Sequence, residues 1–197
     1  LDGHHLQSEY FREQADASLP LKKQLWKQTV EAKIKNQAAL LKKRSIGGDE
    51  LSILSQKVRS GDPDNREGVA ARIYWEKLMG KGFKREREGQ APNNLLNYGY
   101  IVLRAAVARA LVGSGLLPTL GIHHKSRYNA YCLADDIMEP YRPFVDEVVV
   151  RIVEKYEDIE ALTKEMKADL LEVLTADVQF GKMKRPLMVG LSMTTAS

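Results

Sequence analysis

The chain has few of the features that mark exported or membrane-embedded proteins. Its only cysteine, Cys132, cannot form a disulfide within the chain, so a reducing compartment is expected. No apolar run approaches the roughly 20 residues that a membrane span needs, and no signal-peptide pattern opens the sequence. The 14 glycines and 7 prolines are too few for a low-complexity chain. These absences predict a folded cytoplasmic protein.

What is present is the composition of an ordinary domain with a small excess of positive charge. The 197 residues are enough for one well-buried domain, and the hydrophobic and charged fractions, 44% and 28%, are typical of globular proteins. The net charge of +4 permits a polyanionic partner without requiring one.

The ends of the sequence predict a chain shortened on both sides. It begins with leucine rather than methionine, and the stretch 187–197 stops in the middle of its pattern. We therefore divide it into a remnant of an N-terminal region or linker (1–19), a helical domain (20–180) and a C-terminal tail that looks truncated (181–197).

Helical periodicity runs through the whole chain and predicts an all-α fold. The first long helix is expected to start near Pro20, and the nearly apolar helix from about 93 to 117 is expected to be the central buried one. Another is expected to use Asp62 as its N-cap and Pro63 in its first turn, ending at Gly80. The remaining predicted helices are 49–58, 126–141, 145–155 and 162–178, with a short extended segment at 186–191.

The outer face of the first long helix is rich in lysine. We interpret it as a solvated face, with phosphate contact by a few lysines as the alternative. The lysines are Lys22, Lys23, Lys27, Lys33, Lys35, Lys42 and Lys43.

Three acids lie within about one helical turn: Asp135, Asp136 and Glu139. Carboxylates this close repel one another unless a cation lies among them, and a divalent metal is the simplest candidate. Asp136 and Glu139 are three residues apart and share a helix face. The alternative is that they pair with Arg127 and Arg142.

Glu67 is the second candidate ligand. It falls on the inward stripe of its helix with Tyr74, among small residues that allow close approach of another element. A carboxylate on that face needs a partner. The alternative is a first-turn glutamate favoured by the helix dipole.

Two adjacent histidines, His123 and His124, precede the acidic helix and add an imidazole donor. Glutamate, histidine and a further acid on separate elements favour a hard cation, Mg²⁺ or Mn²⁺. Zinc is less favoured because carboxylates outnumber imidazoles.

Taken together, four segments resemble the CRISPR-associated spacer-acquisition integrase, the catalytic subunit of the CRISPR adaptation complex. They occur in the family's order and spread over about half of the chain. The helix LWKQTVEAKIKNQA and the YNAYCLADDIMEPYRP segment are most similar to the type II form. The four segments are REGVAARIYW (66–75), NNLLNYGY (93–100), GIHH (121–124) and LADDIMEPYRP (133–143).

The resemblance implies a β-rich N-terminal domain, absent from this chain, followed by a helical catalytic domain. It implies that Glu67, His124 and either Asp136 or Glu139 bind the divalent metal, with Glu139 favoured for the type II form. Glu67, His124 and Glu139 are then the catalytic set.

The resemblance also implies the reaction and the partners. A DNA 3′-hydroxyl would attack a phosphodiester of the CRISPR array, and His124 would help to protonate the leaving oxygen. The implied partners are double-stranded DNA (prespacer and repeat), a second copy in a homodimer, and a small ferredoxin-like subunit. The candidate phosphate contacts are Lys81, Lys84, Arg85, Lys125 and Arg127.

Two alternatives to the integrase are open. The first is a metal-dependent nuclease, which would use the same ligands to hydrolyse DNA or RNA with water as the nucleophile. The second is a non-catalytic helical scaffold that binds DNA or protein and uses its acids in salt bridges.

Overall fold

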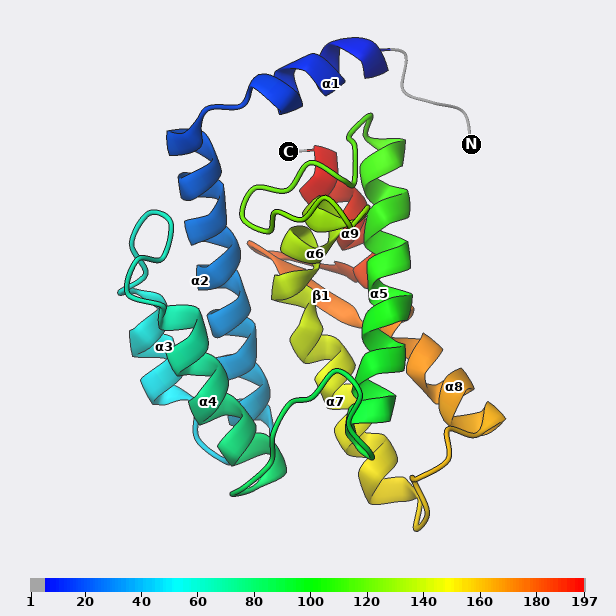
Figure 1. Cartoon of the computed structure of the whole chain (residues 1–197). Coiled ribbons are helices and arrows are strands. Elements are labelled where there is room, and N and C mark those ends of the chain that lie inside the picture. Colours follow the sequence, from blue (N-terminus) through cyan, green and yellow to red (C-terminus); the bar gives the residue numbers. More distant parts are fainter. Residues whose placement is uncertain (1–5, 197) are drawn as a thin grey trace.

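The structure is a computed structural model that describes residues 6–196 (Figure 1). It is helical except for one short hairpin within that range, which confirms the predicted all-α class. The elements are α1 (Gln7–Asp16), α2 (Leu19–Lys43), α3 (Asp49–Ser55), α4 (Arg66–Met79), α5 (Asn93–Gly113), α6 (Cys132–Met138), the 3-10 turn η1 (Glu139–Tyr141), α7 (Arg142–Lys155), α8 (Lys164–Leu171), the 3-10 turn η2 (Glu172–Thr175), β1 (Asp177–Phe180), β2 (Met183–Pro186) and α9 (Leu187–Ala196).

Helix α2 is the element on which the site is built. The Ser18 hydroxyl accepts a hydrogen bond from the Leu21 N–H, and Pro20 lies in the first turn, so the helix begins close to where the sequence predicts. Figure 1 shows α2 alongside α3 and α4, while α6, η1 and α7 descend between α2 and α5. Helix α2 therefore contacts both groups of helices.

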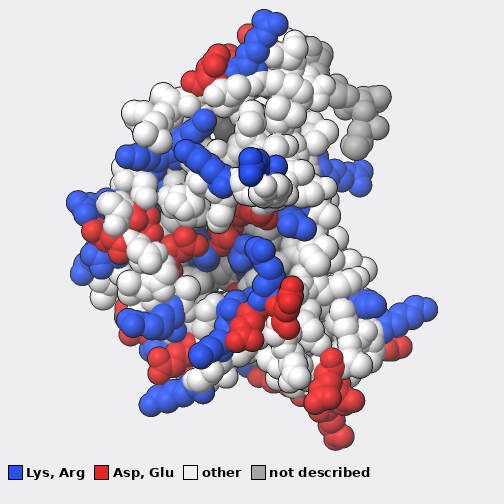
Figure 2. All heavy atoms as spheres, viewed as in Figure 1, with Lys and Arg blue, Asp and Glu red and all other residues white. Residues whose placement is uncertain are grey.

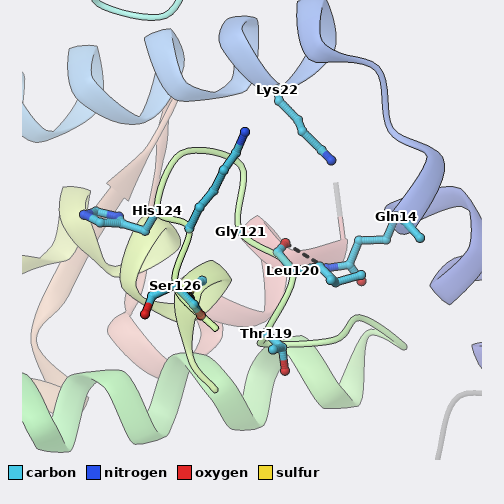
Figure 3. A pocket seen from close by; sticks show the side chains of 10 residues that line it. Gln14, Lys22, Thr119, Leu120, Gly121, His124 and Ser126 are labelled. Atoms are coloured by element: carbon cyan, nitrogen blue, oxygen red, sulfur yellow. Dashed lines mark hydrogen bonds between the residues drawn. The ribbon is translucent and has the colours of Figure 1, made fainter. Parts of the chain in front are cut away.

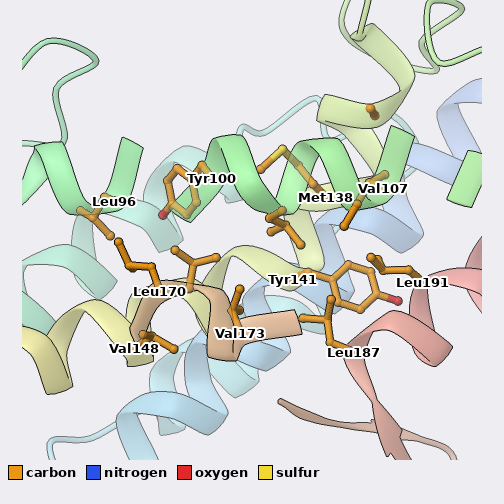
Figure 4. Packing of buried hydrophobic residues seen from close by; sticks show 14 of the residues in the cluster. Leu96, Tyr100, Val107, Met138, Tyr141, Val148, Leu170, Val173, Leu187 and Leu191 are labelled. Carbon is orange, nitrogen blue, oxygen red and sulfur yellow. The ribbon is translucent and has the colours of Figure 1, made fainter. Parts of the chain in front are cut away.

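Two hydrophobic clusters make up the core. The first joins α2, α3 and α4 around Trp26 and Tyr74. The second surrounds α5 and includes side chains of α6, α7, α8 and α9 (Figure 4). Trp75 and Ile122 pack against both clusters. The seam between the clusters is where the predicted site residues meet.

The start of α4 differs from the prediction. It begins at Arg66, and its N-cap is Asn65, whose side chain accepts from the Gly68 N–H and whose φ is +49°. Asp62, predicted as the cap, instead accepts from the N–H groups of Arg66 and Glu67 with its two carboxylate oxygens. The asparagine tolerates the left-handed conformation, so it can end the preceding turn and cap the helix.

The acidic helix is also shorter than predicted. Residues 126–131 form a loop because polar side chains bond to nearby backbone: Ser126 accepts from the Tyr128 N–H and Asn129 from the Tyr131 N–H. The helix α6 begins only at Cys132. It tightens into η1 at Pro140, the position where the sequence predicts a disturbance.

The helix predicted over 162–178 is confirmed only in part, and the extended segment predicted at 186–191 is wrong. The helix α8 ends at Leu171, β1 pairs antiparallel with β2, and 187–191 belongs to the helix α9. The residues expected to form a tail, 181–197, lie within the described range up to 196. Their side chains Leu187 and Leu191 are fully buried in the α5 cluster.

Helix α5 is the central helix, as predicted, although it ends at Gly113 rather than near residue 117. Contrary to the expectation from sequence, it is long and apolar enough to cross a membrane by length and composition. Half of its most apolar window is buried inside the fold, which is also the pattern of a core helix.

Candidate metal centre

The site is organised around the ammonium group of Lys33, which bridges two carboxylates from different elements. Its Nζ lies 2.6 Å from Oε1 of Glu67 on α4 and 2.5 Å from Oε2 of Glu139 in η1. The Lys33 and Glu139 side chains are only 11% and 4% exposed, whereas Glu67 is 25% exposed. Two of the predicted ligands therefore converge on one cation. Lys33 does not lie on the solvated lysine face to which the sequence assigns it.

The positive charges around Glu139 lower its pKa by more than its burial raises it. Burial alone raises the pKa of this carboxyl, but Lys33 and Arg142 lower it below its ordinary value. Arg142 Nη2 lies 2.8 Å from Glu139 Oε1, so each oxygen of Glu139 faces a cation. Burial lowers the pKa of Lys33, and the neighbouring Glu139 and Glu67 raise it above its usual value. Glu139, Lys33 and Arg142 are thus all charged at neutral pH. The pairing with Arg142 is one that the sequence offers as the alternative to metal binding.

Asp136 has a different environment from Glu139. It is fully buried, and its carboxylate accepts backbone N–H bonds from Ile122, His123 and His124 at 2.7, 2.9 and 3.1 Å. Successive N–H groups turned toward one anion form a strong local cradle. Asp136 therefore fixes the loop that carries the histidines.

The glycine of the GIHH segment is required for this close approach. A β-carbon on Gly121 would lie 2.4 Å from the His124 carbonyl oxygen and 2.9 Å from Asp136 Oδ2. Both distances are below any normal contact, and the first involves backbone that cannot rotate away. The loop can wrap around Asp136 only because this position lacks a side chain.

His124 is oriented by the same carboxylate. Its Nδ1 lies 2.6 Å from Asp136 Oδ1, and this hydrogen bond is the main reason that its pKa is raised above the usual value. The charges of Asp136 and Glu139 raise that pKa further. Nδ1 faces the carboxylate as the donor, so in the neutral ring the lone pair is on Nε2. A carboxylate behind a histidine is the usual arrangement around metal-binding imidazoles.

His123 faces Trp26 of α2. The two rings stack 4.0 Å apart with 5° between their planes, while His124 meets Trp26 edge-on at 5.9 Å. Trp26 and Lys33 are seven residues apart and so lie on one face of α2. The same helix face thus supports the histidine loop and the two glutamates.

The donor set fits a hard divalent cation in part. Among the described residues, no three His, Cys, Asp or Glu side chains are grouped closely enough to hold a metal. The Glu67 and Glu139 oxygens nevertheless share one cation, the Lys33 ammonium, and His124 is near enough for its charge to lower the pKa of Glu139. Carboxylates with one imidazole are ligands that Mg²⁺ and Mn²⁺ accept.

A small cavity of about 230 Å³ opens beside His124. Figure 3 shows Lys22 of α2 and Gln14 of α1 on one side of it, and His124 and Ser126 of the loop on the other. Gln14 donates to the carbonyl oxygens of Leu117 and Leu120, which ties α1 to the start of this loop. The site is therefore open to solvent on the side of His124.

The basic residues predicted to bind phosphates differ in availability. Lys81, Lys84, Lys125 and Arg127 are exposed. Arg85 instead donates hydrogen bonds to the side chains of Asn93 and Asn97 and lies over the Tyr100 ring, so it holds its loop against α5. On the face of the molecule drawn in Figure 2, basic and acidic side chains are intermingled, and that face has no continuous basic surface.

Sequence reasoning missed two features of the site region. One is Lys33, which could have been found from its seven-residue spacing to Trp26. The other is the fully buried Asp146 on α7, which accepts from the hydroxyls of Tyr74 at 2.7 Å and Tyr100 at 2.5 Å. It joins α4, α5 and α7, and it lies four residues after Arg142, the partner of Glu139, on α7.

The fold and site define a helical domain built around a carboxylate–histidine centre. The chain belongs to the family described as "CRISPR associated protein Cas1", which matches residues 3–171. It is 42% identical over 173 residues to a CRISPR-associated endonuclease Cas1 of Neisseria meningitidis and 32% identical over 171 residues to one of Francisella tularensis subsp. novicida. These matches cover 87% and 76% of this chain but only 57% and 54% of the relatives, so it spans little more than half of their length.

Solved structures share the fold at low sequence identity. A Cas1 protein from Thermotoga maritima superposes with a TM-score of 0.73 at 20% identity, over 99% of this chain and 69% of that one. A casposase bound to integration product gives 0.77 at 18% identity, over 97% of this chain and 67% of that one. A partial Cas6-RT-Cas1–Cas2 complex gives 0.78 at 20% identity, over 99% of this chain and 70% of that one. The predicted family is confirmed, whereas the type II form remains a prediction.

Proposed function

We propose that this chain is the helical catalytic part of a metal-dependent DNA integrase and endonuclease of CRISPR adaptation. The observation that carries the proposal is the convergence of Glu67 and Glu139 on one buried cation, beside a His124 held by Asp136. Membership of the Cas1 family supports it. The names of the relatives support an endonuclease, and the casposase with its integration product supports strand joining.

In this proposal, Glu67, Glu139 and Nε2 of His124 hold a Mg²⁺ or Mn²⁺ ion. The bound ion would polarise a phosphodiester and stabilise the charge that develops on its oxygens. Asp136 is assigned to positioning, because its oxygens already accept three backbone N–H bonds and the His124 ring. This assigns the third ligand to Glu139 rather than Asp136.

The proposed partners are double-stranded DNA, a second copy of the protein and a small partner subunit, acting in the cytoplasm. The fold similarity to chains of two Cas6-RT-Cas1–Cas2 complexes, one of them partial, supports a partner subunit. Exposed Lys81, Lys84, Lys125 and Arg127 are the proposed phosphate contacts. The contacts of Arg85 favour a structural role for it.

The test uses the purified full-length protein with its partner subunit, Mn²⁺ and a labelled short duplex with free 3′-hydroxyls plus a repeat-containing target. Joined products running above the target support integration, whereas shortened products alone support hydrolysis. Glu67→Gln, His124→Ala and Glu139→Gln should each abolish joining, because each removes a proposed ligand. Lys35→Met, an exposed change on α2, is the control. Undiminished joining by the Glu67 and His124 variants would refute the proposal.

A further inference from the structure

We propose that Lys33 is a built-in counter-cation that holds Glu67 and Glu139 together in the metal-free protein and must leave for a divalent ion to bind them. The inference rests on the proposed metal site. It concerns a residue that is neither one of the proposed ligands nor one of the proposed phosphate contacts. It makes Lys33 a competitor of the metal as well as a positioning residue for its ligands.

The competition follows from the identity of the oxygens. The ammonium lies within hydrogen-bond distance of Glu67 Oε1 and Glu139 Oε2, so both oxygens contact the same nitrogen. The other Glu139 oxygen, Oε1, already faces Arg142. Mg²⁺ binds carboxylate oxygens at about 2.0–2.1 Å. An ion bridging the same pair would therefore occupy the place of Nζ, and the two cations exclude each other.

The positioning role follows from burial and charge. Two carboxylates that approach one site repel each other, and Glu139 is almost fully buried, so water cannot compensate its charge as it can in part for Glu67. The Lys33 charge supplies that compensation from α2, whose buried side chains Val30 and Ile34 fix the backbone on either side. The flexible four-carbon stem of lysine allows the ammonium to withdraw while the helix stays in place.

These two roles predict that replacing Lys33 lowers the stability of the metal-free protein and raises its affinity for a divalent ion. Removing the ammonium leaves Glu67 without its cation and Glu139 with Arg142 alone, so the metal-free protein should become less stable. It also removes the competitor from the shared oxygens, so a divalent ion should bind more tightly. A residue with only a structural role would lower stability and would weaken or leave unchanged the binding of metal.

The experiment compares Lys33→Met with wild type in the full-length protein. Free Mn²⁺ is titrated and followed by its electron paramagnetic resonance signal, and thermal unfolding is measured in EDTA. We expect the melting temperature in EDTA to fall by several degrees and the Mn²⁺ dissociation constant to fall at least tenfold. Lys35→Met is the matched control, because it removes the same charge from the same helix where the side chain is 60% exposed. It should change neither quantity appreciably.

The outcomes separate the inference from the proposal on which it rests. Wild type that binds Mn²⁺ while Lys33→Met binds it equally or more weakly overturns the competitor role and leaves the metal site standing. No Mn²⁺ binding by either protein overturns both. Should Lys33→Met fail to fold, Lys33→Gln, which is neutral but can still donate to the carboxylates, is measured in the same way and decides on the same criteria.

Discussion

The buried carboxyl of Asp146 should make the stability of this fold fall as pH rises. Burial is the main reason that its pKa is raised from 3.8 to about 6, against hydrogen bonds from Tyr100 and Tyr74 that lower it. The native state therefore holds this proton more tightly than the unfolded chain. Its contribution to stability is complete below pH 3.8 and is lost as pH rises through about 6.

The size of the effect follows from the two pKa values. The step from 3.8 to about 6 corresponds to about 3 kcal/mol in full, of which about 2 kcal/mol falls between pH 4.5 and 7.5. Asp146→Asn cannot ionise, and its amide can still accept from one tyrosine hydroxyl and donate to the other. The free energy of unfolding of the variant minus that of wild type should thus rise by about 2 kcal/mol over this pH range.

Urea unfolding followed by circular dichroism at five or six pH values measures this difference directly. All other titrating groups are common to both proteins and cancel. Asp16→Asn, the same substitution at an exposed position at the end of α1, is the matched control. The reasoning that burial dominates the pKa of this carboxyl is refuted if the free energy of unfolding of Asp146→Asn minus that of wild type changes by less than about 0.5 kcal/mol over this pH range.

Three further predictions concern the histidine loop and the C-terminal helix. Gly121→Ala should lower the free energy of unfolding by about 1–3 kcal/mol and weaken Mn²⁺ binding, because the added β-carbon displaces the His124 carbonyl. Gly113→Ala is the control, because the space around its added carbon is open, and it should change neither quantity measurably in the same urea and Mn²⁺ titrations. Asp136→Asn should lower the pKa of His124, seen by NMR titration of its ring, because the hydrogen bond to the carboxylate is the main cause of its elevation; an unchanged or higher pKa would contradict this. Leu191→Ala should cost about 2–5 kcal/mol in urea unfolding, and a loss below about 1 kcal/mol would show that α9 is not part of the core.

The long helices could be predicted because their signals are local. Ser18 with Pro20 marks the start of α2, and the apolar surface of α5 marks its central place. Boundaries were wrong where side chains replaced backbone hydrogen bonds, as at Asn65 and Asn129. Such bonds depend on the exact path of the loop, which periodicity does not describe.

The site was predictable in its residue types but not in its pairing. Close acids indicated a cation, and the structure supplies one at Glu139. That this cation is Lys33 depends on the register of α2 against α4 and η1, which is a tertiary contact. The different roles proposed for Asp136, which positions the loop, and Glu139, which binds the metal, also depend on tertiary contacts. The N–H groups around Asp136 belong to a loop twelve to fourteen residues earlier in the sequence.

The seam between the two hydrophobic clusters has a mechanical consequence. Glu67 lies on α4, which belongs to the first cluster. Glu139 lies between Met138 and Tyr141 of the second cluster, and His124 is hydrogen-bonded to Asp136 on the adjoining helix α6. Trp75 and Ile122 pack against both clusters. A small opening of this seam would separate the proposed ligands without altering any of them. Substitutions at Trp75 or Ile122 should therefore weaken the proposed metal site without changing any of the residues that form it.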